Sequence, residues 1–257
     1  MRRLRIGDRS MRVRDEGEGR RAPLVCIHGA GGSSVAFMDT VRRFAAGRRV
    51  VAIDLPGHGQ SDAWHPPEEV SIAMYRDAVG TVCANLKIER AVLLGHSMGG
   101  QIALACAAAW PERAAGLVVL CSGAKLPVAP RVFEILERDF AHAPEWLARV
   151  SFSPATPREL VERWTGLLLT CEPPIAIADF RAVERFDGAA LAASVRAPSL
   201  VLGGEDDLLA PPKLQHELAA QISGARAVVL PRAGHQLHLE QPAAYFSELE
   251  GFLVGAS

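Results

Sequence analysis

The sequence has almost no net charge, and this limits the partners it can attract electrostatically. It contains 28 Lys and Arg residues against 29 Asp and Glu residues, so its formal net charge is −1. Proteins that bind nucleic acid or an anionic membrane surface usually carry a clear excess of positive charge. We therefore expect neither nucleic acid nor a membrane as a partner.

A long apolar run is also missing. The basic N-terminal segment Met1–Ile6 is not followed by one, and no stretch reaches the length of a membrane-spanning helix. We therefore expect a soluble, cytoplasmic protein without a signal peptide.

Paired cysteines are absent as well. None of the five cysteines forms a C-x-x-C pair; they are Cys26, Cys83, Cys106, Cys121 and Cys171. They lie in apolar stretches, which favours buried free thiols over disulfides or metal ligands.

Signals for a cofactor or a metal are weak. The glycine-rich stretch Gly29–Gly32 has neither the G-x-G-x-x-G register nor a Walker lysine. His235 and His238, with Glu240, lack the third histidine and the helix of a zinc-protease motif. Glu240 is better explained as a residue that caps or anchors the last helix. We therefore expect neither a cofactor nor a metal.

Apolar strands alternate with helices over most of the chain. Residues 1–20 alternate loosely, as in a β-hairpin. Continuous apolar strands separated by helices predict an α/β fold, with a mostly parallel sheet and helices on both faces. The expected strands are residues 23–27, 49–55, 91–94, 116–121, 199–203 and 227–230, and the first two are expected to be buried.

The pattern changes between residues 124 and 187, where only helices are predicted. Thr156-Pro157-Arg158-Glu159 has the spacing of a capping box with proline at the first helical position. A segment this long is unusual as a mere connection. We therefore expect an α/β core of residues 1–123 and 188–257, and a helical insertion of residues 124–187.

The most informative motif is Gly95-His96-Ser97-Met98-Gly99, which has the form G-x-S-x-G. An expected strand precedes it, and an expected helix follows it. A serine on such a sharp turn exposes its hydroxyl at the end of the sheet, and the flanking glycines relieve the crowding. The N-terminus of the following helix favours negative charge nearby. This arrangement predicts a nucleophile.

A nucleophilic serine needs a base and a group that orients the base. In a parallel sheet, functional side chains gather after the carboxyl ends of the strands. Asp206 and Asp207 follow one expected strand, and His235 follows another. The chain order serine, acid, histidine is the one expected for a G-x-S-x-G enzyme on this type of sheet.

Five motifs occur in order along the chain. They are HGAGG at residues 28–32, DLPGHGQSD at 54–62, GHSMGG at 95–100, Gly204–Asp207 with Pro211, and Gly234-His235 with Glu240 and Pro242. Together they resemble the α/β-hydrolase superfamily, in particular esterase-like serine hydrolases with a helical cap. The resemblance implies the α/β-hydrolase fold, with residues 124–187 forming a cap after the sixth strand.

The resemblance also implies a catalytic triad. Ser97 would attack a carbonyl carbon, and His235 would accept the serine proton and later deliver it to the leaving group. Asp207 fits the family pattern G-x-x-D counted from Gly204 and would orient His235. Asp206 is the alternative acid.

An oxyanion hole is implied by the same resemblance. Met98, which follows the nucleophile, would supply one amide donor. The loop after the first buried strand would supply the other, from Ala30 or, as a second choice, from Gly31.

The cap would cover the site and shape its pocket for a small-molecule substrate. Apolar residues at helical spacing in the cap favour a hydrophobic acyl or alkyl group over a charged one. The alternative is a substrate carboxylate bound by cap arginines that face inward, and the candidates are Arg131, Arg138, Arg163 and Arg181. The aromatic residues among them belong to a packing core at least as often as to a pocket wall. The expected pocket residues are Gly31, Phe133, Leu136, Phe140, Trp164, Leu168, Leu208 and Gln236.

These observations favour a carboxylesterase of the EC 3.1.1 class that cleaves esters of small to medium apolar substrates through an acyl-enzyme on Ser97. Serine rather than aspartate at this position argues against haloalkane dehalogenase and epoxide hydrolase chemistry. A lactonase or a carbon–carbon-bond hydrolase with the same triad stays open, although Gln236 replaces the tryptophan usual in the latter. A binding protein that kept the fold is a third alternative. The sequence does not indicate an oligomeric state.

Overall fold

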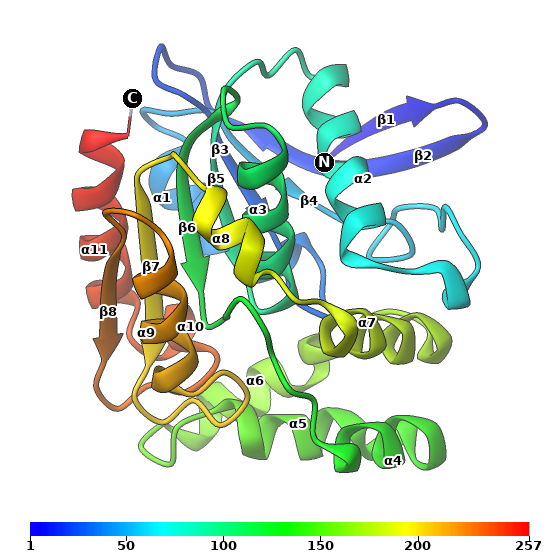
Figure 1. Cartoon of the computed structure of the whole chain (residues 1–257). Helices are drawn as coiled ribbons and strands as arrows, with labels where there is room; N and C mark the ends of the chain where they lie inside the picture. The colour runs from blue at the N-terminus through cyan, green and yellow to red at the C-terminus, as the bar shows by residue number, and fades with distance from the viewer. Residues whose placement is uncertain (257) are drawn as a thin grey trace.

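The computed structural model describes residues 1–256, and these residues form one sheet between layers of helices (Figure 1). Within this part of the chain the strand order is β1-β2-β4-β3-β5-β6-β7-β8. The strands are β1 (Arg2–Ile6), β2 (Arg9–Glu16), β3 (Leu24–Ile27), β4 (Val50–Ile53), β5 (Ala91–His96), β6 (Ala114–Leu120), β7 (Ser199–Gly204) and β8 (Arg226–Leu230).

The sheet is parallel except at one edge. β1 and β2 form an antiparallel hairpin that joins the sheet at β4, and the strands from β4 to β8 in the sheet order are all parallel. Every residue of β3, β4, β5, β6 and β7 is buried, as their continuous apolar sequences require when helices cover both faces. The predicted α/β fold is therefore confirmed. The loops that follow the parallel strands meet at one edge of the sheet.

Helices cover both faces of the sheet (Figure 1), and a separate apolar cluster lies on each face. One face is covered by α1 (Met38–Phe44), α10 (Leu237–Glu240) and α11 (Pro242–Gly255). The other is covered by α2 (Ile72–Asn85), α3 (Met98–Ala109), α8 (Ala189–Ser194) and α9 (Pro212–Gln221). Two short 3₁₀ helices, η1 (Ser34–Phe37) and η2 (Pro67–Glu69), lie in the loops. None of the helices formed by residues 1–256 is long and apolar enough to cross a membrane.

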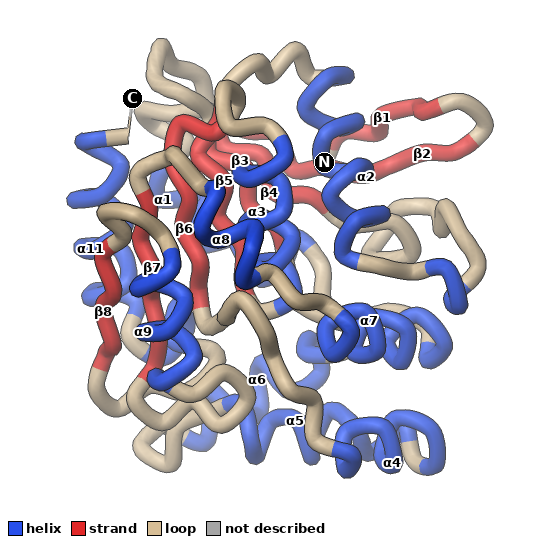
Figure 2. Tube along the Cα trace, viewed as in Figure 1, coloured by secondary structure: helices blue, strands red, loops and turns tan. Residues whose placement is uncertain are grey.

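Helices without strands fill the chain between β6 and β7, and Figure 2 shows most of them beyond the end of the sheet. We use the name cap for α4 (Pro130–Arg138), η3 (Phe140–His142), α5 (Ala143–Ser151), α6 (Arg158–Leu168) and α7 (Pro173–Arg185). The cap has an apolar cluster of its own. The short helix α8 lies back on the sheet against α3. The division of the chain into core and cap at residues 124 and 187 stays a prediction.

The start of α6 differs from the sequence prediction. The helix begins at Arg158 with Pro157 at its N-cap, and no side chain caps it. Thr156 lies before the N-cap, and its hydroxyl donates to the Glu240 carboxylate. The predicted capping box is therefore wrong, because a partner distant in the sequence competes successfully for the threonine.

Candidate active site

Ser97 occupies the sharp turn between β5 and α3. Its φ is 54° and its ψ is −120°, a strained conformation for a residue with a side chain. A Cβ at Gly99 would clash with the carbonyl oxygen of Ile27, and one at Gly95 would clash with the carbonyl oxygen of Gly99. Only glycine therefore lets the helix approach the strands so closely. The turn places Ser97 at the carboxyl edge of the sheet, over the N-terminus of α3.

His235 and Asp207 meet at the same edge. Asp207 follows β7, His235 follows β8, and the Nδ1 atom of His235 lies 2.9 Å and 3.0 Å from the two carboxylate oxygens of Asp207. The amides of Leu209 and Ala210 donate to Oδ1 of this buried carboxylate. Since a carboxylate only accepts, Nδ1 of His235 carries a proton, and whenever the ring is neutral Nε2 is the acceptor. A ring in this state can take a proton from a hydroxyl.

The adjacent carboxylates Asp206 and Asp207 face different partners. Asp206 accepts a hydrogen bond of 2.6 Å from the Ser153 hydroxyl, in the loop between α5 and α6. The Glu240 carboxylate also binds this loop, because it accepts a hydrogen bond from the Ser153 amide. It accepts a second one from the Gly234 amide, next to His235. Glu240 was expected to cap or anchor the last helix, and it does not cap it, because α11 has Gln241 at its N-cap. Its carboxylate instead joins the cap to the segment before His235.

Two backbone amides near Ser97 are available to an anion. Met98 is the first residue of α3, where an amide has no acceptor within the helix. The Ala30 amide, in the loop after β3, has no hydrogen-bond acceptor among residues 1–256. Gly31, the second choice from the sequence, donates its amide to Oδ2 of Asp179 at 2.8 Å. Of the two residues that the sequence offered for this role, Ala30 is thus the one whose amide is free.

Ser97 and His235 line the same cavity beneath the cap. Its volume is ≈ 80 Å³. Its apolar wall is formed by Ala36, Leu147, Leu167, Leu168, Phe180 and Leu209.

A larger surface hollow of ≈ 780 Å³ lies around Arg20, Arg49 and Arg90, at the amino ends of the parallel strands. It contains neither Ser97 nor His235, so it is separate from the cavity beneath the cap.

Two of the eight expected pocket residues, Leu168 and Gln236, line the small cavity. Leu208 does not, since it is 69% exposed while its neighbour Leu209 points into the site. Gly31 is buried under Leu169 and is absent from the cavity wall.

The remaining four expected residues also lie outside the cavity wall. Leu136 and Phe140 belong to the apolar cluster inside the cap, and Phe133 and Trp164 are half-buried away from the site. Helical spacing identifies an apolar face but does not say whether this face meets the cap interior or the substrate. For the same reason no sequence signal identified Leu147 and Phe180 as residues of the cavity wall.

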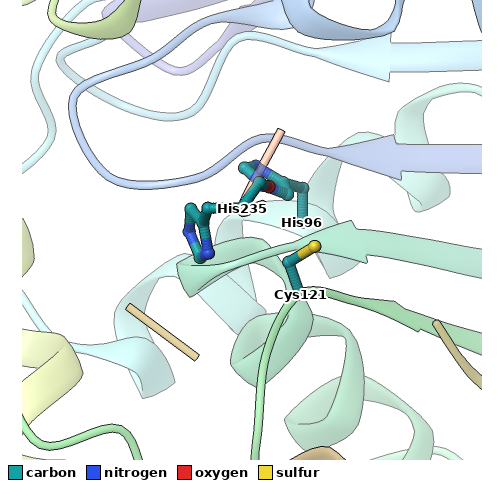
Figure 3. Close-up of side chains that lie close together, drawn as sticks. All are labelled: His96, Cys121 and His235. Carbon is teal, nitrogen blue, oxygen red and sulfur yellow. The ribbon is translucent and has the colours of Figure 1, made fainter. Parts of the chain in front are cut away.

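His96, Cys121 and His235 form a further cluster, which Figure 3 shows at the ends of β5 and β6. One donor atom from each lies within 4.8 Å of the others. The Nε2 atom of His96 donates to the carbonyl oxygen of His235 at 2.8 Å, and the thiol of Cys121 faces the carbonyl oxygen of Gly234. Burial raises the pKa of the Cys121 thiol, whereas a metal requires the thiolate. These groups therefore fit the role of holding the His235 loop better than that of a metal site.

Known proteins match nearly the whole chain. Residues 24–248 match the model of the alpha/beta hydrolase family. The pimeloyl-[acyl-carrier protein] methyl ester esterase of Neisseria meningitidis serogroup A is 28% identical over 243 residues, which cover 89% of this chain and 76% of that protein. A thermophilic esterase from Thermogutta terrifontis is 26% identical, with a TM-score of 0.86 and 100% of both chains covered. Est816, described as an N-acyl homoserine lactone degrading enzyme, is 27% identical, with a TM-score of 0.84 and coverage of 98% of this chain and 100% of that chain.

Proposed function

The chain belongs to the alpha/beta hydrolase family and is a hydrolase, and from this premise we propose that it cleaves carboxylic esters with small apolar acyl groups through an acyl-enzyme on Ser97. The observation that carries the proposal is the pairing of His235 with Asp207 at 2.9 Å, in a ring that lines one cavity with Ser97. The esterases to which the chain is similar support it.

The proposed reaction has two halves. In the first, Nε2 of His235 takes the Ser97 proton as the serine oxygen attacks the ester carbonyl, and the amides of Ala30 and Met98 bind the resulting oxyanion. The tetrahedral intermediate collapses, and the alcohol leaves with the proton from His235. In the second half, His235 deprotonates a water molecule that attacks the acyl-enzyme. The carboxylic acid leaves, and Ser97 regains its proton.

The cavity favours a short acyl group. Its volume of ≈ 80 Å³ is well below the several hundred Å³ typical of ligand pockets. Apart from Ser151, the surrounding side chains from α5, α6 and α7 are apolar, and none of them is charged. A charged acyl group would therefore lose its hydration without an ionic partner. We therefore infer that acetyl to butyryl esters fit the closed cap better than longer ones.

A lactone is the second candidate substrate. The similarity to Est816, a lactone-degrading enzyme by its description, favours it. Ring opening uses the same nucleophile, base and oxyanion donors, and the leaving alcohol then stays attached to the acyl group.

The test uses p-nitrophenyl acetate, butyrate, hexanoate and decanoate with the purified protein. We expect kcat/KM to be highest for the two shorter esters, and Ser97→Ala to lower kcat by at least about 10⁴-fold. Ser122→Ala is a matched control, because this buried hydroxyl at the same end of the sheet has no partner among residues 1–256. Labelling by a fluorophosphonate should require Ser97. Activity that survives Ser97→Ala would refute the proposal, and turnover of γ-butyrolactones but not of linear esters would favour the lactonase.

A further inference from the structure

A carboxylate of the cap is buried against the loops of the core. Asp179, on α7, has no exposed surface. It accepts three hydrogen bonds: from the Gly31 amide at 2.8 Å, from Nε2 of His58 at 2.8 Å and from the Tyr75 hydroxyl at 2.6 Å. These donors come from three separate core segments, the loop after β3, the loop after β4 and α2. Asp179 thus joins the cap to the core at one point.

His58 carries a positive charge in this arrangement. Its Nδ1 atom lies 3.0 Å from the carbonyl oxygen of Pro56, and its Nε2 atom faces the carboxylate of Asp179. Both partners only accept, so both ring nitrogens must be protonated. Burial opposes this charge, but Asp179, with a smaller contribution from Cys171, raises the pKa of His58 to about 10. The buried carboxylate is therefore neutralised by a buried imidazolium.

His28 lies beside His58 and is neutral. The two ring centroids are 4.9 Å apart. Nε2 of His28 accepts from the Leu55 amide, and its Nδ1 atom therefore donates, at 2.8 Å, to the carbonyl oxygen of Gly29. Burial and the adjacent charge on His58 lower the pKa of His28 to about 4. His28 thus acts as a fixed donor to the backbone.

Three successive peptide units around Ala30 are held in place by these contacts. The first contains the carbonyl of Gly29 and the amide of Ala30, and His28 holds its carbonyl. The second contains the Gly31 amide, which Asp179 holds. The third contains the Gly31 carbonyl, which accepts from the Thr170 amide at 2.8 Å. Asp179 lies on the cap helix α7, and Thr170 lies in the loop between the cap helices α6 and α7.

We propose that Asp179 is a positioning residue: together with the His58 imidazolium it fixes the loop that carries the oxyanion donor Ala30. The orientation of the Ala30 amide therefore depends on the cap. The inference rests on the proposed function. If the Gly31 amide loses its partner, the backbone on both sides of Ala30 gains freedom, and the Ala30 amide no longer points at one place. An oxyanion donor works only when it is preorganised for the charge of the transition state.

The consequence differs from that of a lost substrate contact. Asp179 is absent from the cavity wall, so its loss should leave ground-state binding largely unchanged. Loss of a whole oxyanion donor lowers kcat by about 10²–10³-fold, and a misaligned donor should cost somewhat less. We expect Asp179→Asn to lower kcat by about 10- to 100-fold and to change KM by less than about threefold.

The experiment compares Asp179→Asn with Asp139→Asn. Asp139 is an exposed cap carboxylate that pairs with His142, so it controls for charge loss in the cap. Each full-length variant is assayed with p-nitrophenyl acetate, and Ki is measured for a trifluoromethyl ketone, which forms a tetrahedral oxyanion on the nucleophile. In Asp179→Asn, Ki should rise by the factor by which kcat falls. An unchanged kcat, or a rise in KM alone, would overturn the proposal.

Two further results separate the possible failures. If the wild-type protein has no esterase activity, or if Ser97→Ala keeps this activity, the proposed function fails. If the wild-type protein and Ser97→Ala behave as expected but Asp179→Asn resembles wild type, only the positioning role of Asp179 fails. Asp179→Asn leaves the His58 charge buried without a partner, which can prevent folding. The double variant His58→Asn/Asp179→Asn removes both charges and should show the same loss of kcat. If neither variant folds, the pair is a folding anchor, and a separable positioning role is refuted.

Discussion

Replacing Asp207 with asparagine should stop His235 from acting as a base while leaving the loop in place. Oδ1 of Asp207 accepts from the amides of Leu209 and Ala210, and an asparagine can keep both bonds only by pointing its carbonyl oxygen there. Its amide NH₂ then faces Nδ1 of His235. Because that nitrogen must now accept, the ring proton moves to Nε2, the atom that has to receive the Ser97 proton.

The size of the effect follows from this change of tautomer. A serine hydrolase whose histidine is held in the wrong tautomer loses about 10⁴-fold in kcat, which corresponds to about 5 kcal/mol of transition-state stabilisation. Asp206→Asn is the matched control, since an asparagine there can still accept from the Ser153 hydroxyl. We expect this control to keep kcat within about threefold of wild type, because the changed atom bonds no proposed catalytic group.

The assay measures kcat for p-nitrophenyl acetate, with thermal unfolding of each variant to verify that it is folded. A kcat above a tenth of the wild-type value in Asp207→Asn would contradict the proposed change of tautomer. So would a loss in Asp206→Asn as large as that in Asp207→Asn.

Three other predictions address the pocket, the turn and the buried ion pair. Leu168→Ala should raise kcat/KM for the hexanoate relative to the acetate ester roughly tenfold, because the cavity gains room for about two methylenes; an unchanged chain-length profile would contradict the assigned cavity. Gly99→Ala should lower the free energy of unfolding by about 3 kcal/mol or more in urea titrations, since its Cβ would clash with the carbonyl oxygen of Ile27. The pKa of His58 is raised to about 10, so its pairing with Asp179 stabilises the fold fully below pH 6.5. This contribution, of order 3–5 kcal/mol, is lost as the pH rises through about 10. Urea titrations across this pH range should show the loss in wild type and not in His58→Asn/Asp179→Asn.

Local signals in the sequence were sufficient for the fold class. The hairpin, the buried strands and the final helix lie within a few residues of where apolar runs and turn residues predicted them. The pairing of Asp207 rather than Asp206 with His235 agrees with the family pattern, although the catalytic roles of both stay proposals. Such patterns can be recognised in the sequence because the strand period, the turn geometry and each motif are encoded over a few neighbouring residues.

In the cap, local sequence patterns no longer predict which residues meet. Leu136 on α4 and Leu147 on α5 have similar apolar spacing and both belong to the apolar cluster of the cap, yet Leu147 also lines the cavity and Leu136 does not. Thr156 has the spacing of a helix cap and instead bonds Glu240, which lies 84 residues away. In each case the sequence allows two chemically equivalent environments for the side chain, and the one adopted depends on which elements meet in the folded chain.

The sharp turn at Ser97 on a parallel sheet can be predicted from the sequence, because sterics and backbone geometry within a few residues enforce it. Which helix faces line the cavity, and that Asp179 meets His58 and Gly31 across the boundary between cap and core, depends on the tertiary structure. Those contacts join segments up to 148 residues apart, and their energy depends on burial and on charges brought together by folding, which no local pattern records.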